Sequence, residues 1–211
     1  NTNKKNEKSS LMKFSKFISV IFHPIFIPTM VLSIIIFEVP EILSYQKKSL
    51  FFLINVLVLG TIVLPIISIL ILVNRGKIDS IEVANHKQRK FILLPVFLFF
   101  VLSFLTVQCF FPGLYQIKKI YTGACILSLL CFFISNNWKI SLHTVGSGSA
   151  LGVLFSLQLV YGDLLFWVIS FILISLLVGY SRIKELAHNF NQVLIGFLTG
   201  FIIEFCCVFY L

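Results

Sequence analysis

The sequence predicts an all-α protein, a polytopic transmembrane bundle of six to seven helices in a single domain, and three observations indicate this. First, 58% of the 211 residues are hydrophobic and only 12% are charged, which excludes a soluble globular domain with an ordinary polar surface. Second, the chain holds several apolar runs of about 20 residues, enough helix to cross a hydrocarbon core of roughly 30 Å. Third, it has neither an internal repeat nor a low-complexity linker that would divide it.

Seven apolar segments are expected: 15–38, 50–73, 91–111, 119–136, 144–161, 164–180 and 190–211. The fifth and sixth are shorter, and the YGD sequence between them indicates a turn. We expect residues 1–13 to form a polar tail and residues 14–211 to form the transmembrane domain. No cleavable signal is expected before the first run; the chain opens on Asn1, and Met12 is a candidate native start.

Basic residues are distributed unevenly between the two sides of this bundle. If all seven segments span, the tail and the loops 74–90, 137–143 and 181–189 share one side and hold all but four of the Lys and Arg residues. The exceptions are Lys47, Lys48, Lys118 and Lys119. Because cations favour the cytoplasmic side, this bias predicts that the three loops are cytoplasmic, although part of the excess could belong to a functional site. Loops that emerge on one face can converge on a single site.

The converging loops carry cations and two histidines. Arg89 and Arg182 are suited to a dianionic group through paired N–H bonds, and Lys87 adds a point charge. His143 precedes a run of small residues, and a helix that begins there would direct free N–H groups at an anion. With His188 at the start of the last apolar segment, two imidazoles and these cations are sufficient for phosphoryl transfer without a metal.

Gln192 lies four residues after His188, on the same face of the expected helix. An amide at this place could orient the imidazole and fix its tautomer. We therefore interpret Gln192 as an orienting residue of the site.

The stretch SRIKELAHNFNQVLIG, residues 181–196, resembles the third signature of the type 2 phosphatidic acid phosphatase superfamily. That signature reads Ser-Arg, five residues, His, three residues and Asp, followed by Val and a later Gly. The matching residues are Ser181, Arg182, His188, Val193 and Gly196. Gln192 stands where the family usually has Asp. An Asp would stabilise an imidazolium, whereas an amide can only orient the ring, so an active site would be slower or would use another charge, for which Glu185 is a candidate.

The other two signatures of this family have shorter counterparts. Ser141 and His143 match the second signature, Pro-Ser-Gly-His, in a sequence that lacks its Pro and Gly. Arg89 and the nearby Lys87 are the counterparts of the first signature, a Lys six residues before Arg-Pro, although the Pro is displaced to Pro95 and no Lys stands at the required offset. The resemblance extends over about residues 75–211 and implies a helical core like that of the family.

The resemblance also implies roles for these residues. His188 would be the nucleophile that forms a phosphohistidine, and His143 would be the acid for the leaving group. The phosphate cradle would comprise Arg182, Arg89, Lys87 and Ser141. No metal or other cofactor is implied. The family's site commonly faces away from the cytoplasm, so the sidedness of this site stays open.

Three functions remain open. The first is a membrane phosphatase for a lipid phosphate or diphosphate, of the phosphatidate, phosphatidylglycerophosphate or polyprenyl diphosphate type. The second is a catalytically silent member of the family that binds or moves a lipid phosphate, and the third is a small unrelated membrane transporter. We expect a multi-pass protein of a bacterial inner membrane with membrane lipids as partners. Nucleic acid is not expected, because the +9 net charge forms no aromatic and basic face outside the apolar runs.

Other notable residues receive structural interpretations. His23, directly before Pro24 in the first apolar run, is expected to satisfy backbone carbonyls at a kink, with a place in the lining of the site as the alternative. Glu204 is expected to snorkel towards the far interface. Gly196 and Gly200 indicate a close helix contact. The five cysteines are interpreted as small hydrophobic residues, with neither a metal nor a disulfide.

Overall fold

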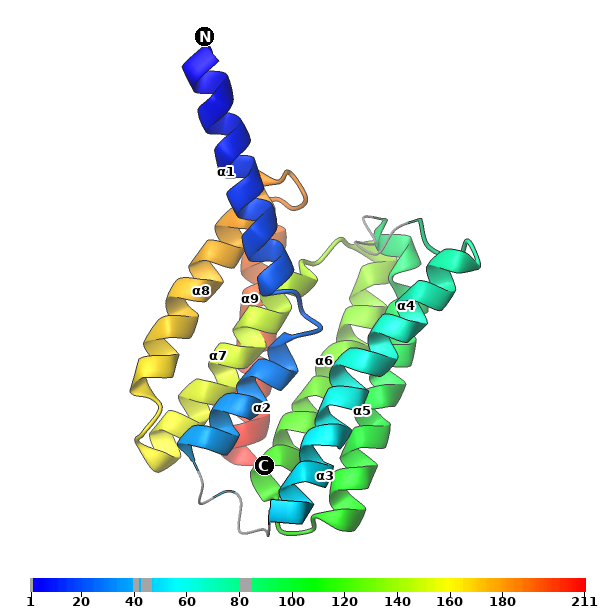
Figure 1. The fold of residues 1–211 in the computed structure, drawn as a ribbon, viewed down its shortest axis with the longest axis vertical. Helices are drawn as coiled ribbons and strands as arrows, with labels where there is room; N and C mark the ends of the chain where they lie inside the picture. Colours follow the sequence, from blue (N-terminus) through cyan, green and yellow to red (C-terminus); the bar gives the residue numbers. More distant parts are fainter. Residues whose placement is uncertain (1, 40–41, 43–46, 80–84) are drawn as a thin grey trace.

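The computed structural model describes residues 2–39, 42, 47–79 and 85–211, apart from the side chains of 2–9, 47–49 and 86. The described residues form helices and no strands, which confirms the all-α prediction (Figure 1). The α-helices are α1 (Thr2–Ile21), α2 (Ile27–Glu38), α3 (Lys47–Val58), α4 (Leu64–Asn74), α5 (Lys90–Phe110), α6 (Tyr115–Asn137), α7 (Leu142–Tyr161), α8 (Leu165–Lys184) and α9 (Phe190–Tyr210). A π-helix, Leu59–Val63, joins α3 to α4, and His86–Gln88 forms a short 3₁₀ turn.

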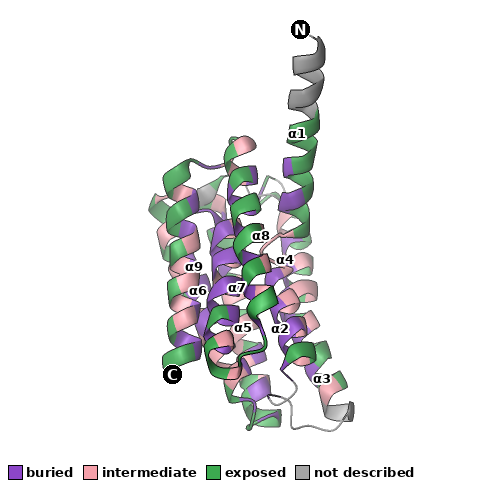
Figure 2. Ribbon diagram, turned by 90° about the vertical axis from the view of Figure 1, so that its left-hand side faces the viewer, coloured by how far each residue is buried: buried purple, intermediate pink, exposed green. Residues whose placement is uncertain are grey.

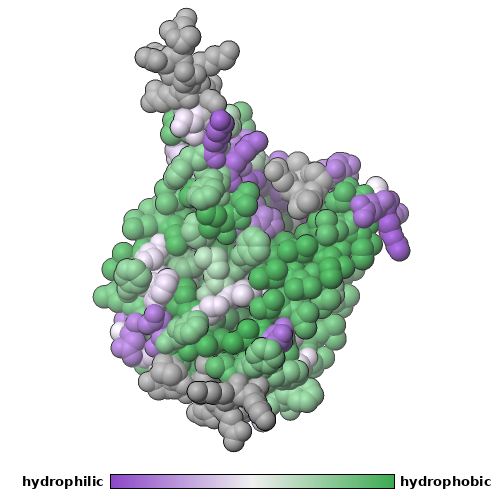
Figure 3. Space-filling view, in the orientation of Figure 1, coloured by the Kyte–Doolittle hydropathy of each residue, from purple (hydrophilic) through white to green (hydrophobic). Residues whose placement is uncertain are grey.

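Six helical segments among the described residues are long and apolar enough to cross a membrane. They are Leu50–Asn74, which combines most of α3 with the π-helix and α4, and the five helices α5 to α9. The chain is therefore an integral multi-pass membrane protein. Figure 3 shows the broad hydrophobic face that such a bundle presents to lipid, with hydrophilic residues gathered near α1 and in smaller groups elsewhere.

The first predicted segment, 15–38, is not one helix, and the expected polar tail is helical from Thr2 onward. The helix breaks between Ile21 and Ile27, because Pro24 has no backbone N–H and disfavours helical conformation in the residue before it. After the break, Pro28 lies in the first turn of α2, where a missing N–H does no harm. As a result, α2 has only 12 residues and packs against α7 inside the bundle.

The π-helix has a local cause in Pro65, one turn after Thr61. Pro65 cannot donate to the carbonyl of Thr61, and the backbone instead forms a wider turn in which Leu64 N–H donates to the Leu59 carbonyl. The Thr61 hydroxyl lies 2.5 Å from the hydroxyl of Thr29 in α2. The wide turn thus brings a hydroxyl to the inside of the bundle and connects α2 to the α3–α4 span.

Helix α7 is largely buried at the centre of the bundle (Figure 2). It makes a close contact with α9, in which glycines of the two helices face each other. Added Cβ atoms at Gly148 and Gly152 of α7 would collide with backbone carbonyls of α9, and one at Gly200 would collide with the backbone of α7. A Cβ at Gly196 would lie 2.9 Å from the carbonyl oxygen of Ser141. The close helix contact expected at Gly196 and Gly200 is confirmed, and it has a counterpart on α7.

Several of the loops and helix ends lie together at one end of the molecule (Figure 1). The connections from α6 to α7 and from α8 to α9 lie at the end from which α1 projects, as do the end of α4 and the start of α5 (Figure 1). The loops that carry the predicted site residues therefore share one end of the bundle.

Replacing Gly200 by Ala should destabilise the protein, because the new methyl group meets the carbonyl of Val145. We expect a loss of about 1–3 kcal/mol, as in other overpacked cores, measured by thermal or denaturant unfolding in detergent. The matched control is Gly146→Ala on α7, whose Cβ would make only ordinary contacts, at 3.5 Å, with α2 and its preceding turn. Equal stabilities of the two variants would contradict the proposed packing.

Candidate functional site

A cavity of about 200 Å³ lies within the bundle, and one part of its lining carries most of the polar groups. His23, Arg89, His143, Arg182 and His188 contribute the imidazoles and guanidiniums of this polar part. Most of the remaining lining is apolar and comes from α2, α4, α5, α6 and α7. The structure thus brings together four of the residues selected from the sequence and adds His23.

The turn between α8 and α9 positions Arg182 and His188. The backbone N–H groups of Ala187 and His188 each donate to the Arg182 carbonyl at 3.2 Å, and Leu186 adopts a left-handed conformation with φ of 55°. This turn ends α8 in the manner of a helix C-cap. The six-residue separation of the two side chains is therefore fixed by a closed backbone turn.

A capping box starts α9 directly after His188. The Asn189 side chain accepts from the Gln192 backbone N–H at 2.9 Å, and Gln192 Oε1 accepts from the Asn189 N–H at 3.3 Å. Gln192 therefore stabilises the helix start, and the same oxygen is close to the imidazole of His188.

The His188 ring is held in one tautomer. Its Nδ1 lies 3.2 Å from the Lys139 carbonyl oxygen and 3.1 Å from Gln192 Oε1. Both oxygens are acceptors, so Nδ1 must carry the proton and Nε2 must carry the lone pair. Burial, followed by the charge of Arg89, lowers the pKa of His188 to about 4. A neutral imidazole with a free electron pair on Nε2 therefore lines the cavity at neutral pH.

The other two histidines are held in a comparable way. His143, in the first turn of α7, donates from Nε2 to the Ser19 carbonyl oxygen at 3.1 Å, so its Nδ1 carries the lone pair when the ring is neutral. His23 accepts at Nδ1 from the Ile25 N–H at 3.3 Å, so its proton lies on Nε2. The two rings pack edge to face, with their centroids 5.1 Å apart.

Two guanidiniums give the cavity its positive charge. Arg89, only 6% exposed, donates from Nη1 to the Ile140 carbonyl oxygen at 2.5 Å. Burial, followed by the charge of Arg182, lowers the pKa of Arg89 to about 10, which leaves it protonated at neutral pH. A buried cation and a partly buried one that repel each other would be stabilised by an anion close to both.

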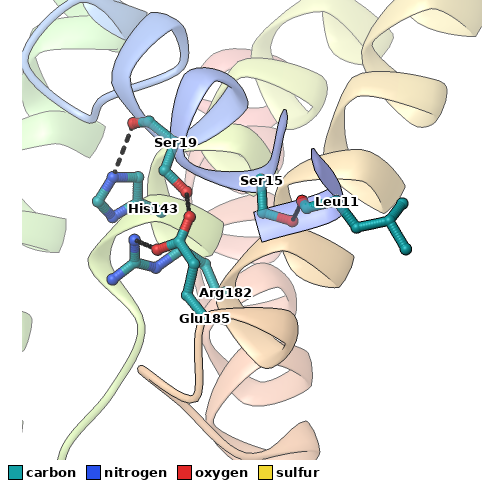
Figure 4. Close-up of polar contacts among 6 residues, drawn as sticks. All are labelled: Leu11, Ser15, Ser19, His143, Arg182 and Glu185. Atoms are coloured by element: carbon teal, nitrogen blue, oxygen red, sulfur yellow. Dashed lines mark hydrogen bonds and ion pairs between the residues drawn. The ribbon is translucent and has the colours of Figure 1, made fainter. Parts of the chain in front are cut away.

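Arg182 belongs to a polar cluster that connects the site to α1 (Figure 4). Its Nη1 donates to Glu185 Oε2 at 2.7 Å, and Glu185 Oε1 accepts from the Ser19 hydroxyl at 2.8 Å. The carbonyl of the same Ser19 accepts from His143. Glu185, the candidate extra charge for His188, therefore interacts with Arg182 and Ser19.

Two predicted phosphate-binding residues lie outside the cavity lining. Lys87 has an exposed side chain in the 3₁₀ turn and does not line the cavity. Ser141 is fully buried at the N-cap of α7, and its Oγ has no hydrogen-bond partner among the described residues. Its backbone N–H donates to the Gln192 carbonyl at 3.3 Å, which connects the start of α7 to α9. Neither residue therefore lines the cavity in this structure.

Glu204 lines the apolar part of the cavity and is only 3% exposed, so the expectation that it snorkels to the far interface is wrong. The carboxyl faces Gly123 of α6, and its own Cβ lies near Gly152 of α7. These two glycines leave the space that encloses it. Its Oε2 has no hydrogen-bond partner among the described residues.

The alternative interpretation of His23, a place in the lining of the site, is confirmed, and its Nδ1 accepts from a backbone N–H and does not satisfy a carbonyl. The helix break does place the ring at a bend, yet the ring also lines the cavity beside His143. The signal in the sequence is the pair of prolines that follow it, Pro24 and Pro28, which indicates a break in the helix.

Comparison with models of known protein families, with curated proteins and with solved structures finds no match for this chain. Among the residues that the structure describes, no group of three or more His, Cys, Asp or Glu side chains is arranged to hold a metal ion.

Replacing Glu204 by Met should stabilise the protein, because it removes a buried carboxyl oxygen that has no partner and keeps a similar volume. We expect a gain of about 1–3 kcal/mol in the free energy of unfolding, measured in detergent. Glu38→Met, at the exposed end of α2, is the control and should change stability little. A less stable Glu204→Met variant would show that the carboxyl has a stabilising partner.

Proposed function

We propose that this protein is a metal-independent phosphatase for a lipid phosphate or diphosphate, acting through a phosphohistidine at His188. The observation that carries the proposal is the tautomer of His188. Two acceptors hold its Nδ1 proton, so Nε2 carries a lone pair, and the ring lines a cavity together with Arg89 and Arg182. A nucleophile beside cations is the arrangement that phosphoryl transfer requires.

The reaction would proceed in two steps. In the first, His188 Nε2 attacks phosphorus, the bond from phosphorus to the lipid oxygen breaks, and that oxygen takes a proton from Nδ1 of a protonated His143. In the second, water attacks the phosphohistidine, the P–N bond breaks, and His143 accepts the proton of the water. Arg89 and Arg182 would neutralise the charge on the equatorial oxygens in both steps.

The apolar part of the cavity supports a lipid substrate. Its lining includes Val31, Ile69, Phe100, Leu127 and Val153, which come from α2, α4, α5, α6 and α7. A phosphate at the arginines would place an attached hydrocarbon chain among these side chains, which favours an amphiphilic ligand. A phosphatidate, a phosphatidylglycerophosphate and a polyprenyl diphosphate all have this chemistry.

Membership of the type 2 phosphatidic acid phosphatase superfamily is part of the proposal. The support is the sequence resemblance over residues 181–196 together with the geometry of the residues that carry it. Arg182 and His188 follow the family spacing and line one cavity with His143, the counterpart of the second histidine. We also propose that the protein lies in a bacterial inner membrane.

A catalytically silent protein that binds or moves a lipid phosphate is the second candidate. Two observations favour it: Arg182 already pairs with Glu185, and the side chain of Lys87 is exposed outside the cavity. Binding of a phosphate would then require only that Arg182 exchange one anionic partner for another, with no chemical step.

Phosphate release from a panel of lipid phosphates, in detergent and with a chelator present, tests the first candidate against the second. His188→Ala should abolish release, and His143→Ala should reduce it by about 10²–10⁴-fold, because it loses the acid. Lys77→Ala, at an exposed residue outside the cavity lining, is the control and should retain most of the activity. Binding without release by the intact chain would favour the silent protein, and release unaffected by both histidine substitutions would sink the phosphatase proposal.

Replacing Gln192 by Asp tests how the site stabilises the nucleophile. A carboxylate near Nδ1 would stabilise the imidazolium that forms during attack, whereas the Gln192 oxygen is only a dipole. We expect the rate of phosphohistidine formation to rise by about tenfold in Gln192→Asp, measured in single-turnover experiments. Gln192→Leu, which removes the acceptor, should lower it. Identical rates in the two variants would show that Gln192 acts only in the capping of α9.

A further inference from the structure

His23 occupies an unusual place for a residue between two helices. It lies in the break between α1 and α2, and its ring lines the cavity together with Arg89 and Arg182. The break follows from the prolines, so the ring is carried into the bundle by backbone geometry. If packing were the only role of this residue, a phenylalanine side chain would serve equally well.

The contacts of His23 fix the proton on one nitrogen. The Ile25 N–H donates to Nδ1 at 3.3 Å, which occupies that lone pair and leaves Nε2 as an N–H donor. Burial, followed by the charge of Arg182, lowers the pKa of His23 to about 4. The edge-to-face contact with His143, at 86° between the ring planes, fixes the orientation of the imidazole.

We propose that His23 is a third histidine of the phosphate site, where its Nε2–H donates a hydrogen bond to a non-bridging oxygen of a phosphate held by Arg89 and Arg182. The proposal rests on the proposed function, because it assumes that the cavity binds a phosphate group. It adds a neutral donor from the α1–α2 break to a cradle otherwise made of cations from α5 and α8.

His23 would bind the phosphate and leave proton transfer to His143. Protonation at Nδ1 would displace the Ile25 N–H, and loss of the Nε2 proton would create an imidazolate. His143 differs, since its Nε2 is engaged by a carbonyl and its Nδ1 can gain and lose a proton. The three histidines thus divide into a nucleophile, an acid and a fixed donor.

Two substitutions separate this role from packing. His23→Phe keeps an aromatic ring against His143 and removes the donor. His23→Gln loses the ring but offers an amide N–H near the position of Nε2. A packing role predicts that Phe is the better replacement, whereas phosphate binding predicts that Gln is better.

The experiment measures the binding of orthovanadate, an inorganic phosphate analogue, to the intact chain and both variants in detergent, together with kcat and KM for a short-chain lipid phosphate. We expect His23→Phe to weaken vanadate binding by about 10–100-fold, the range for a hydrogen bond to a charged group, and His23→Gln to remain within about threefold of the intact chain. Melting temperatures establish that both variants are folded.

Each outcome bears on the proposal. Normal vanadate binding by a folded His23→Phe variant would overturn it, as would a Gln variant that binds no better than the Phe variant. If the intact chain binds vanadate but hydrolyses no lipid phosphate, the phosphatase proposal fails while the binding comparison still decides the role of His23. If the intact chain binds neither vanadate nor the lipid phosphate, both proposals fail. Weakened binding of the lipid but not of vanadate would assign His23 to the lipid and overturn its contact with the phosphate.

Discussion

The site depends on the close contact between α7 and α9. Because α8 returns the chain, α7 and α9 both begin at the same end of the bundle (Figure 1). Glycines on both helices allow their backbones to approach closely. The Ser141 N–H donates to the Gln192 carbonyl, and the Lys139 carbonyl lies close to His188 Nδ1. Main-chain groups therefore set the place and the tautomer of the proposed nucleophile.

A second constraint comes from the prolines of the first apolar run. They end α1 at the site, so that one residue of α1, Ser19, contacts both His143 and Glu185 (Figure 4). Glu185 in turn holds Arg182. The N-terminal helix is thereby part of the polar network, and a change in its position would alter an imidazole and a guanidinium together.

Much of the fold follows from composition and periodicity, since apolar runs of membrane length dictate helices whose backbone groups are satisfied internally. The sequence also indicates that Arg89, His143, Arg182 and His188 lie at one end, because helices of similar length return the chain to the same side. The extent of the break at Pro24 and Pro28 cannot be predicted from hydropathy, because the apolar sequence continues through the break whereas the helical hydrogen bonds do not.

The missed details of the site depend on three-dimensional packing. The position of Glu204 along α9 predicts that it lies at the interface. The space that encloses its side chain is provided by Gly123 and Gly152, which belong to other helices, so it cannot be predicted from α9 alone. Lys87 follows the charge pattern, but its side chain is exposed in a short turn and does not line the cavity, so its contact with a phosphate stays a prediction. Such a turn has no strong periodicity from which its orientation could be predicted.

The central claim is that His188 becomes covalently phosphorylated, and it is tested most directly by trapping the intermediate. The intact chain would be mixed with a lipid phosphate labelled with ³²P, quenched in alkali and digested for mass spectrometry. The account predicts a phosphoryl group on Nε2 of His188, stable in alkali and lost in acid, and no label in His188→Ala. Turnover of the lipid with no phosphorylated His188, or with the label on another residue, would contradict it.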